Sequence, residues 1–111
     1  MRKLKIQIKD KEYTLEMNRE SIKWLEANGF IASDFENKPI TYADLVWNSL
    51  FLKNHPDVNK NLSIKLMDEY IEEGKSVGAV LNFALEEYST FINALTDIKS
   101  AKKEKLEIIT E

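Results

Sequence analysis

From Leu4 to Met17, hydrophobic and polar residues alternate with a period of two. This alternation is typical of strands that bury one face, and the polar break at Asp10-Lys11 divides it into two, so the pattern predicts a β-hairpin over residues 3–17. A two-residue turn at Asp10-Lys11 would pair apolar residues on one face and opposite charges on the other. The expected pairs are Ile8 with Tyr13, Ile6 with Leu15, Leu4 with Met17, Lys9 with Glu12 and Lys5 with Glu16. A slightly longer loop stays an alternative, because Lys11 does not readily adopt positive φ.

After the hairpin, apolar residues recur at intervals of three and four, which is the spacing of helices. Asn18 and Ser76 are expected N-caps, whereas Gly29 and Gly74 are expected C-terminal stops. Thr41, followed three positions later by an acidic residue, resembles the start of a second helix. The predicted helices cover about residues 19–28, 42–54, 58–73 and 77–98.

The connector over residues 31–40 contains three apolar residues, Ile31, Phe35 and Ile40, which we expect to hold it against the domain. An isolated hairpin is marginally stable in water, so its apolar face must pack on the helices. The sequence therefore predicts one α+β, mainly α domain over residues 1–98, with an N-terminal β-hairpin packed on about four helices. Residues 99–111 are expected to form a charged C-terminal extension.

Aromatic residues do not all fit the apolar stripes of these helices. Trp24 projects about 200° away from Ile22. Trp47 and Phe51 belong to a helix that is apolar almost all round, which indicates either a central buried helix or one shared with a partner. Because exposed aromatics are enriched at protein interfaces, Trp24, Trp47 and Phe51 are the candidate partner-binding residues. Simple core packing is an alternative of nearly equal weight.

Composition narrows the classes of function. The 111 residues are 43% hydrophobic and 32% charged, with a formal net charge of -3, so no overall positive field attracts nucleic acid. The basic stretch from Lys99 to Lys105 lacks aromatics and contains Glu104, which favours a solubilising tail over nucleic-acid binding. The absence of cysteine excludes disulfides and cysteine-ligated zinc, and it fits a reducing cytoplasm.

Charged residues interrupt the apolar residues of the N-terminus, so we expect no signal peptide. No later apolar run is long enough to cross a bilayer. The sequence therefore predicts a cytoplasmic protein without membrane contact.

Reactive side chains do not converge in the sequence. His55 is the single histidine, so no imidazole cluster forms, and its place beside Pro56 suggests a helix-end or loop residue. The adjacent Glu86 and Glu87 point about 100° apart on a helix and are interpreted as surface charge, not a catalytic pair. The acidic residues Asp68, Glu69, Glu72 and Glu73 are interpreted as a solvated helix face. We therefore expect no catalytic residue, no cofactor and no metal, and a protein that acts by binding other proteins.

Two segments carry a resemblance to a known family. Glu12 to Lys23, continuing from Leu25 to Phe30, and the run Phe51-Leu52-Lys53-Asn54-His55-Pro56-Asp57-Val58 resemble the tail assembly chaperones of long-tailed phages and prophages of Gram-positive bacteria. The resemblance covers about the first two-thirds of the chain. It implies a protein of the bacterial host cytoplasm that binds the tape-measure protein and keeps it soluble until tail-tube proteins assemble around it. It carries over no catalytic residue.

The resemblance also raises two further hypotheses. Many members have a longer, frameshifted form, and the codons for Lys102-Lys103 are a candidate slippery site. The second hypothesis is that the chain self-associates through its aromatic helix surface. Two other classes of function stay open, namely a structural tail or head-tail connector protein and a small nucleic-acid-binding regulator.

Overall fold

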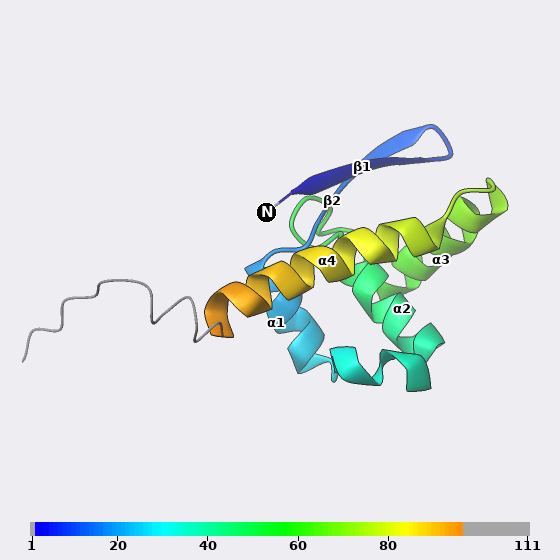
Figure 1. Ribbon diagram of the computed structural model, residues 1–111. Coiled ribbons are helices and arrows are strands. Elements are labelled where there is room, and N and C mark those ends of the chain that lie inside the picture. Colours follow the sequence, from blue (N-terminus) through cyan, green and yellow to red (C-terminus); the bar gives the residue numbers. More distant parts are fainter. Residues whose placement is uncertain (1, 97–111) are drawn as a thin grey trace, which may run out of the picture.

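The computed structural model describes residues 2–96, which form a hairpin followed by helices (Figure 1). The predicted α+β, mainly α fold with an N-terminal hairpin is confirmed. The charged extension over residues 99–111 and the last two positions of the predicted helix 77–98 lie outside the described residues. The elements are β1 (Lys3–Ile8), β2 (Lys11–Glu16), α1 (Arg19–Ala27), the 3-10 helix η1 (Ala32–Asn37), α2 (Pro39–Ser49), α3 (Lys60–Glu72) and α4 (Val77–Thr96).

The register of the hairpin differs from the predicted one. Lys9 and Asp10 have positive φ angles of 49° and 66°, so the two-residue turn lies one position earlier than expected and has the backbone of a type I′ turn. Ile6 therefore pairs with Tyr13, not with Leu15. The predicted pairs are wrong by two residues, but the same side chains face the core, because a shift of two preserves the alternation of faces.

The capping predictions at both ends of α1 are confirmed. Asn18 Oδ1 accepts a hydrogen bond from the main-chain N–H of Ser21 at 3.0 Å. Gly29 has a φ of 81°, and the N–H of Phe30 donates to Leu25 O at 2.9 Å, which closes a Schellman motif. Ser76 also caps α4, and Gly74 follows α3 with a φ of 79°.

Helix α2 starts three residues before the predicted position. Pro39 is its first residue, and proline suits this place because its φ is already helical and its missing N–H would have no helical partner. The predicted cap at Thr41 is therefore wrong. The helix ends at Ser49, and turns occupy residues 50–54, so the predicted end at residue 54 is also wrong.

The connector before α2 is partly ordered as η1. Phe35 packs against the core, with its ring centroid 6.2 Å from that of Tyr42, as expected. Ile31 and Ile40 are 56% and 78% exposed, so the expectation that they hold the connector in place is wrong. Phe35 therefore anchors this segment, together with Asp34, whose Oδ2 accepts a hydrogen bond from the Tyr42 hydroxyl at 3.1 Å.

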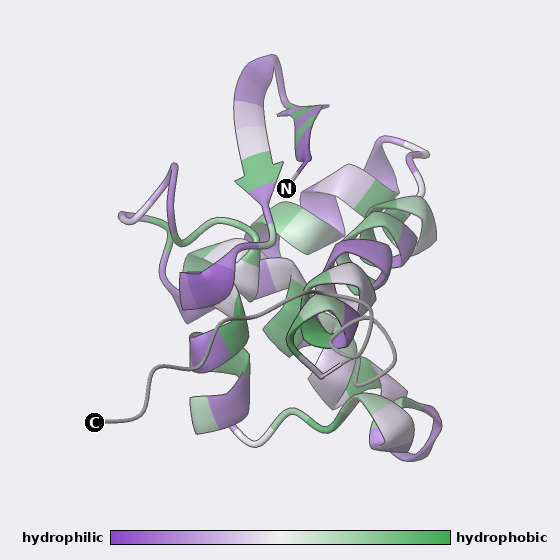
Figure 2. Ribbon diagram, turned by 60° about the vertical axis from the view of Figure 1, so that its left-hand side comes forward, coloured by the Kyte–Doolittle hydropathy of each residue, from purple (hydrophilic) through white to green (hydrophobic). Residues whose placement is uncertain are grey.

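Helix α2 lies at the centre of the core and packs against α1, α3, α4 and η1. Trp47, Leu50 and Phe51 are fully buried, and Trp47 Nε1 donates to Ser63 O at 2.8 Å. Hydrophobic residues gather along the helices in the middle of the molecule, whereas the hairpin turn is hydrophilic (Figure 2). The sequence left two alternatives for this almost wholly apolar helix, a central buried helix or one shared with a partner. The structure shows the central buried helix.

The outer side of β2 is fastened to the turn that follows α2. The N–H of Glu16 donates to Leu50 O at 3.1 Å, and the N–H of Thr14 donates to His55 Nε2 at 2.9 Å. The His55 ring also lies edge-on to Tyr13, with centroids 5.1 Å apart. His55 therefore holds the hairpin on the helices.

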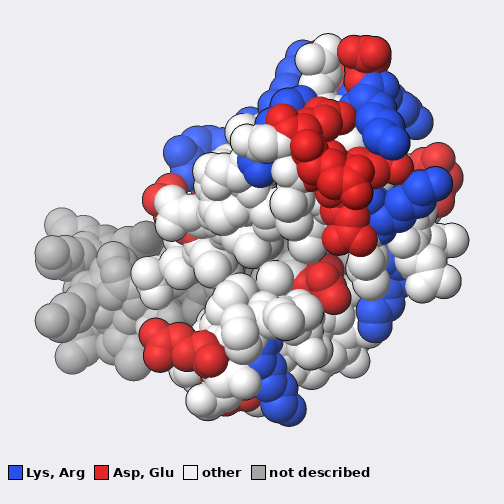
Figure 3. All heavy atoms as spheres, turned by 90° about the vertical axis from the view of Figure 1, so that its right-hand side faces the viewer, with Lys and Arg blue, Asp and Glu red and all other residues white. Residues whose placement is uncertain are grey.

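Charged residues fasten the hairpin turn to the end of α3. The N–H of Lys9 donates to Glu73 Oε1 at 2.6 Å, and Lys75 Nζ donates to Gln7 O at 2.6 Å. Lys9 Nζ also lies 3.8 Å from Glu69 Oε1. Acidic and basic side chains accordingly gather in neighbouring patches at this end of the molecule (Figure 3).

Among residues 2–96, no helix has the length and apolar character that a membrane span requires.

Candidate functional site

The three aromatic residues predicted to bind a partner lie in different environments. Trp47 and Phe51 are fully buried and pack on each other, with centroids 5.5 Å apart. Neither side chain is on the surface, so core packing, the alternative of nearly equal weight, holds for both residues. Trp24 is partly buried against the core. Periodicity reports that a helix is apolar on all sides, but it does not report whether the chain itself or a partner covers each side.

Apolar surface is instead open on the second half of α4. This helix lies across the other helices, and its C-terminal half reaches α1 (Figure 1). Phe91 and Ile92 are partly buried, and Leu95 is 60% exposed. Phe91 and Leu95 are four residues apart, which places them on one side of the helix. The Arg19 guanidinium from the start of α1 lies 5.1 Å from the centroid of the Phe91 ring.

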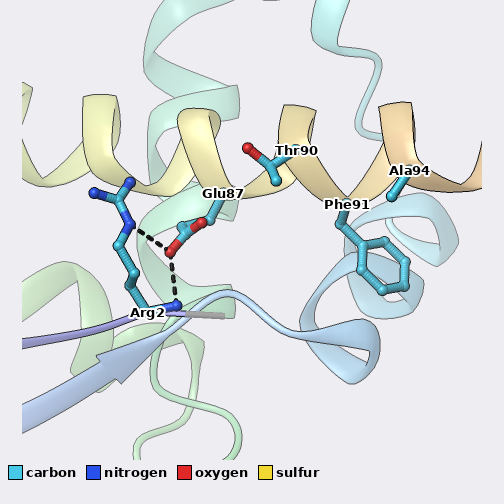
Figure 4. Close-up of a pocket in the computed structure, with 5 residues that line it drawn as sticks. All are labelled: Arg2, Glu87, Thr90, Phe91 and Ala94. Carbon is cyan, nitrogen blue, oxygen red and sulfur yellow. Dashed lines mark hydrogen bonds and ion pairs between the residues drawn. The ribbon is translucent and has the colours of Figure 1, made fainter. Parts of the chain in front are cut away.

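A pocket of about 480 Å³ opens between this half of α4 and the N-terminal residues. Figure 4 shows Arg2 reaching Glu87 from below the helix, and the ring of Phe91 pointing toward α1. The wall combines an aromatic ring and a methyl group with a hydroxyl and the ion pair of an exposed arginine with a buried glutamate. The residues that line the pocket are Arg2, Glu87, Thr90, Phe91 and Ala94. Together with Arg19 and Leu95 they are called the Phe91 surface below.

Arg2 and Glu87 form the polar part of the Phe91 surface. Glu87 Oε1 accepts from the main-chain N of Arg2 at 2.7 Å and from its Nε at 2.9 Å. Burial acts to raise the pKa of Glu87, but the two hydrogen bonds and the charge of Arg2 outweigh it and hold that pKa below its usual value. The carboxylate therefore stays ionised although it is buried.

The interpretation of both adjacent glutamates as surface charge is correct for Glu86 and wrong for Glu87. Glu86 is exposed, and its Oε2 lies 3.2 Å from Arg2 Nη2. Glu87 is buried because the first residues of the chain lie against α4 at this point. No signal in the sequence indicated this contact, since 85 positions separate the partners.

A second hollow of about 240 Å³ lies on the other side of Arg19, lined by Asn18, Arg19, Glu20 and Lys53. Beside it, the buried Glu16 contacts Lys53 Nζ at 3.1 Å and Lys3 Nζ at 3.9 Å. Burial acts to raise the pKa of Glu16, yet hydrogen bonds from Asn18 and Lys53 lower it further than burial raises it. Two cationic side chains near the apolar Phe91 surface thus pair with buried carboxylates, Arg2 with Glu87 and Lys53 with Glu16.

Other ionisable residues have structural contacts. Glu69 and Glu73, which the sequence placed on a solvated face, bind Lys9 and Lys75 at the hairpin turn. Within residues 2–96, no three His, Asp or Glu side chains lie close enough together to hold a metal ion.

The arrangement described above is that of a small, mainly helical α+β domain with an apolar, cation-bordered surface at the end of its longest helix. The chain belongs to the DUF5055 family, described as a domain of unknown function, and the match covers residues 1–111. No curated protein and no solved structure matches the chain.

Proposed function

We propose that this protein is a tail assembly chaperone of a long-tailed phage or prophage, which binds the tape-measure protein in the host cytoplasm and keeps it soluble until tail-tube proteins assemble. The first support is the resemblance of two segments to that family. Residues 12–30 form β2, α1 and the turn after it, and residues 51–58 form the turn after α2. These segments touch through the Thr14 to His55 hydrogen bond, so they act as one structural unit.

The observation that carries the proposal is the open apolar side of α4 at the Phe91 surface. A chaperone for a long apolar client needs apolar surface that its own fold does not cover. Phe91 and Leu95 supply such a surface at helical spacing, which suits an amphipathic helix lying alongside α4. Arg2 and Arg19 at its border suit a client helix flanked by acidic residues.

Co-expression with the tape-measure protein tests the proposal. The wild-type chain is expected to raise the soluble fraction of the tape-measure protein and to co-purify with it. Leu95→Ser is expected to reduce both effects, because it places a hydroxyl in the apolar contact while the exposed site costs the fold little. Ile40→Ser is the matched control, since Ile40 is also exposed but belongs to α2, away from the Phe91 surface.

Two outcomes would contradict the proposal. The first is the absence of any complex or gain in solubility with the wild-type chain. The second is an equal loss of co-purification and solubility with both serine variants, which would show that client binding does not depend on the Phe91 surface. Purified particles give a further test, because a chaperone is absent from the finished tail, whereas a connector or ring subunit is present in it.

A further inference from the structure

One edge of the hairpin is closed by the rest of the fold. In antiparallel pairs, residues alternate between those whose main-chain groups bond the neighbouring strand and those whose groups point away from it. The N–H of Thr14 bonds His55 and the N–H of Glu16 bonds Leu50, so both residues of β2 point away from β1. Their partners in the register are Lys5 and Lys3.

It follows that the main-chain groups of Lys3, Lys5 and Gln7 point away from β2, along the outer edge of β1. Gln7 O is occupied, because Lys75 Nζ donates to it at 2.6 Å. In the part of the chain from residue 2 to residue 96, no hydrogen bond reaches the main chain of Lys5. Such an edge exposes the donors and acceptors that another strand can pair with.

The charges on the solvent face of the hairpin are ordered by strand. β1 presents the exposed Lys3 and Lys5, whereas β2 carries the exposed Glu12 and the buried Glu16 near them. Lys3 Nζ lies 3.9 Å from Glu16 Oε1, and Lys5 Nζ lies 3.8 Å from Glu12 Oε1. Opposite charges on neighbouring strands attract and like charges repel. A strand added beside β1 is therefore favoured when its solvent face is acidic.

The opposite face of β1 is apolar. Leu4 is partly buried and packs against the core beside the fully covered residues of the hairpin. An apolar residue on the inner face of an added strand would cover what remains exposed of Leu4. The edge thus favours a segment in which acidic residues alternate with apolar ones.

We propose that the outer edge of β1 is a docking site for an extended, acidic segment of a partner protein, which adds to the hairpin as a third strand. A second copy of this chain does not suit the site. Two β1 strands placed side by side in antiparallel orientation would bring lysines against lysines on the solvent face, and like charges directly opposite each other destabilise a strand pair. Arg2 of the Phe91 surface directly precedes this edge in the chain, but the docking site uses the main chain of β1 and does not depend on the chaperone proposal.

Amide hydrogen exchange in the full chain tests this site directly. The probe is a capped six-residue peptide in which valine alternates with glutamate, and the control peptide alternates valine with lysine. The Lys5 N–H is expected to exchange rapidly in the free protein and to slow at least about tenfold when the acidic peptide pairs with it. The Ile6 N–H, which faces β2, serves as an internal reference that is protected throughout.

A charge reversal sharpens the test. Lys5→Glu is expected to weaken binding of the acidic peptide roughly tenfold and to admit the basic one, since one attraction becomes a repulsion. The Lys5 side chain is 70% exposed, so the variant should fold. An unchanged Lys5 exchange rate in excess acidic peptide would overturn the proposal, as would equal protection by the basic peptide. Protection of the Lys5 amide that grows with protein concentration in the absence of peptide would show that a second copy of the chain occupies the edge. This result would also overturn the proposal.

Discussion

Glu87 Oε1 accepts two hydrogen bonds from Arg2, one from the main-chain N at 2.7 Å and one from Nε at 2.9 Å. The contact joins the start of β1 to the middle of α4 and places a buried carboxylate in the wall of the pocket. The hairpin is thus attached to the helices at both ends, here and at the turn where Lys9 bonds Glu73.

The first prediction concerns the pH dependence of stability. The pKa of Glu87 in the folded protein lies below the ordinary glutamate value of 4.5. A carboxyl group whose pKa is lowered by folding contributes its full stabilisation at pH values above the ordinary glutamate pKa. This contribution is lost as the pH falls through the pKa that the group has in the folded protein. We expect Glu87→Gln to have a lower urea midpoint than the wild type at pH 7 and the difference to shrink below about pH 4.5. Urea unfolding at several pH values measures this.

The matched control for that experiment is Glu86→Gln, because Glu86 is exposed and meets the same arginine. It should change the midpoint less than Glu87→Gln at every pH. A constant difference between wild type and Glu87→Gln from pH 7 to pH 3 would show that the carboxylate charge does not matter to the fold.

The second prediction compares the two tryptophans. Trp47→Ala removes a fully buried ring and the indole N–H that donates to Ser63 O, so we expect a loss of about 3 to 5 kcal/mol in the free energy of unfolding. Trp24→Ala should cost clearly less, because Trp24 is only partly buried. Chemical denaturation of both variants measures the difference, and equal losses would mean that Trp24 is as much a core residue as Trp47.

The third prediction tests His55 as the anchor of the hairpin. His55→Phe keeps a ring against Tyr13 but removes the acceptor of the Thr14 N–H, so we expect a loss of about 1 to 2 kcal/mol. The exchange rate of the Thr14 amide should rise in the same variant. Asn54→Ala is the comparison, since its 3.4 Å bond to Thr14 O is longer and exposed. An unchanged Thr14 exchange rate in His55→Phe would rule out the anchor.

The fourth prediction is a pair of glycine substitutions with opposite signs. Gly29→Ala forces a side chain into a φ of 81°, which should cost about 1 kcal/mol although the added methyl group meets no atom. Gly78→Ala lies in α4, where the new Cβ would meet only Ser76 Oγ at 3.6 Å, and should gain about 0.5 kcal/mol from helix propensity. Thermal unfolding of both variants shows whether the signs differ.

Local chemistry explains which predictions from the sequence are confirmed. The caps at Asn18 and Ser76 and the stops at Gly29 and Gly74 depend on residues at most a few positions away, so the sequence alone indicates them. The faces of the hairpin are correct for the same reason, since alternation is a local property. The predicted register is wrong by two residues. A turn at Asp10-Lys11 and a turn at Lys9-Asp10 place the same side chains on each face of the hairpin, so alternation does not distinguish them.

Contacts between distant residues explain where the predictions fail. Trp47 and Phe51 were candidates for a partner surface, and the hairpin and α3 cover them instead. Leu95 falls within the predicted helix 77–98, where spacing alone does not tell a buried apolar residue from an exposed one, and it is exposed at the end of α4. The burial of Trp47 and Phe51 and the exposure of Leu95 both depend on how the helices cross. The spacing of apolar residues within one helix does not predict that crossing.

The amino-acid sequence by itself therefore determined the order of the hairpin and the four α-helices, the ends marked by Asn18, Gly29, Gly74 and Ser76, and which side of each strand is apolar, because capping and periodicity act over a few residues. Only the tertiary structure decided which apolar sides stay open, which glutamate is buried against Arg2, and which edge of the hairpin remains unpaired between residues 2 and 96. Burial depends on what the rest of the chain places against a residue, and that is a property of the assembled fold.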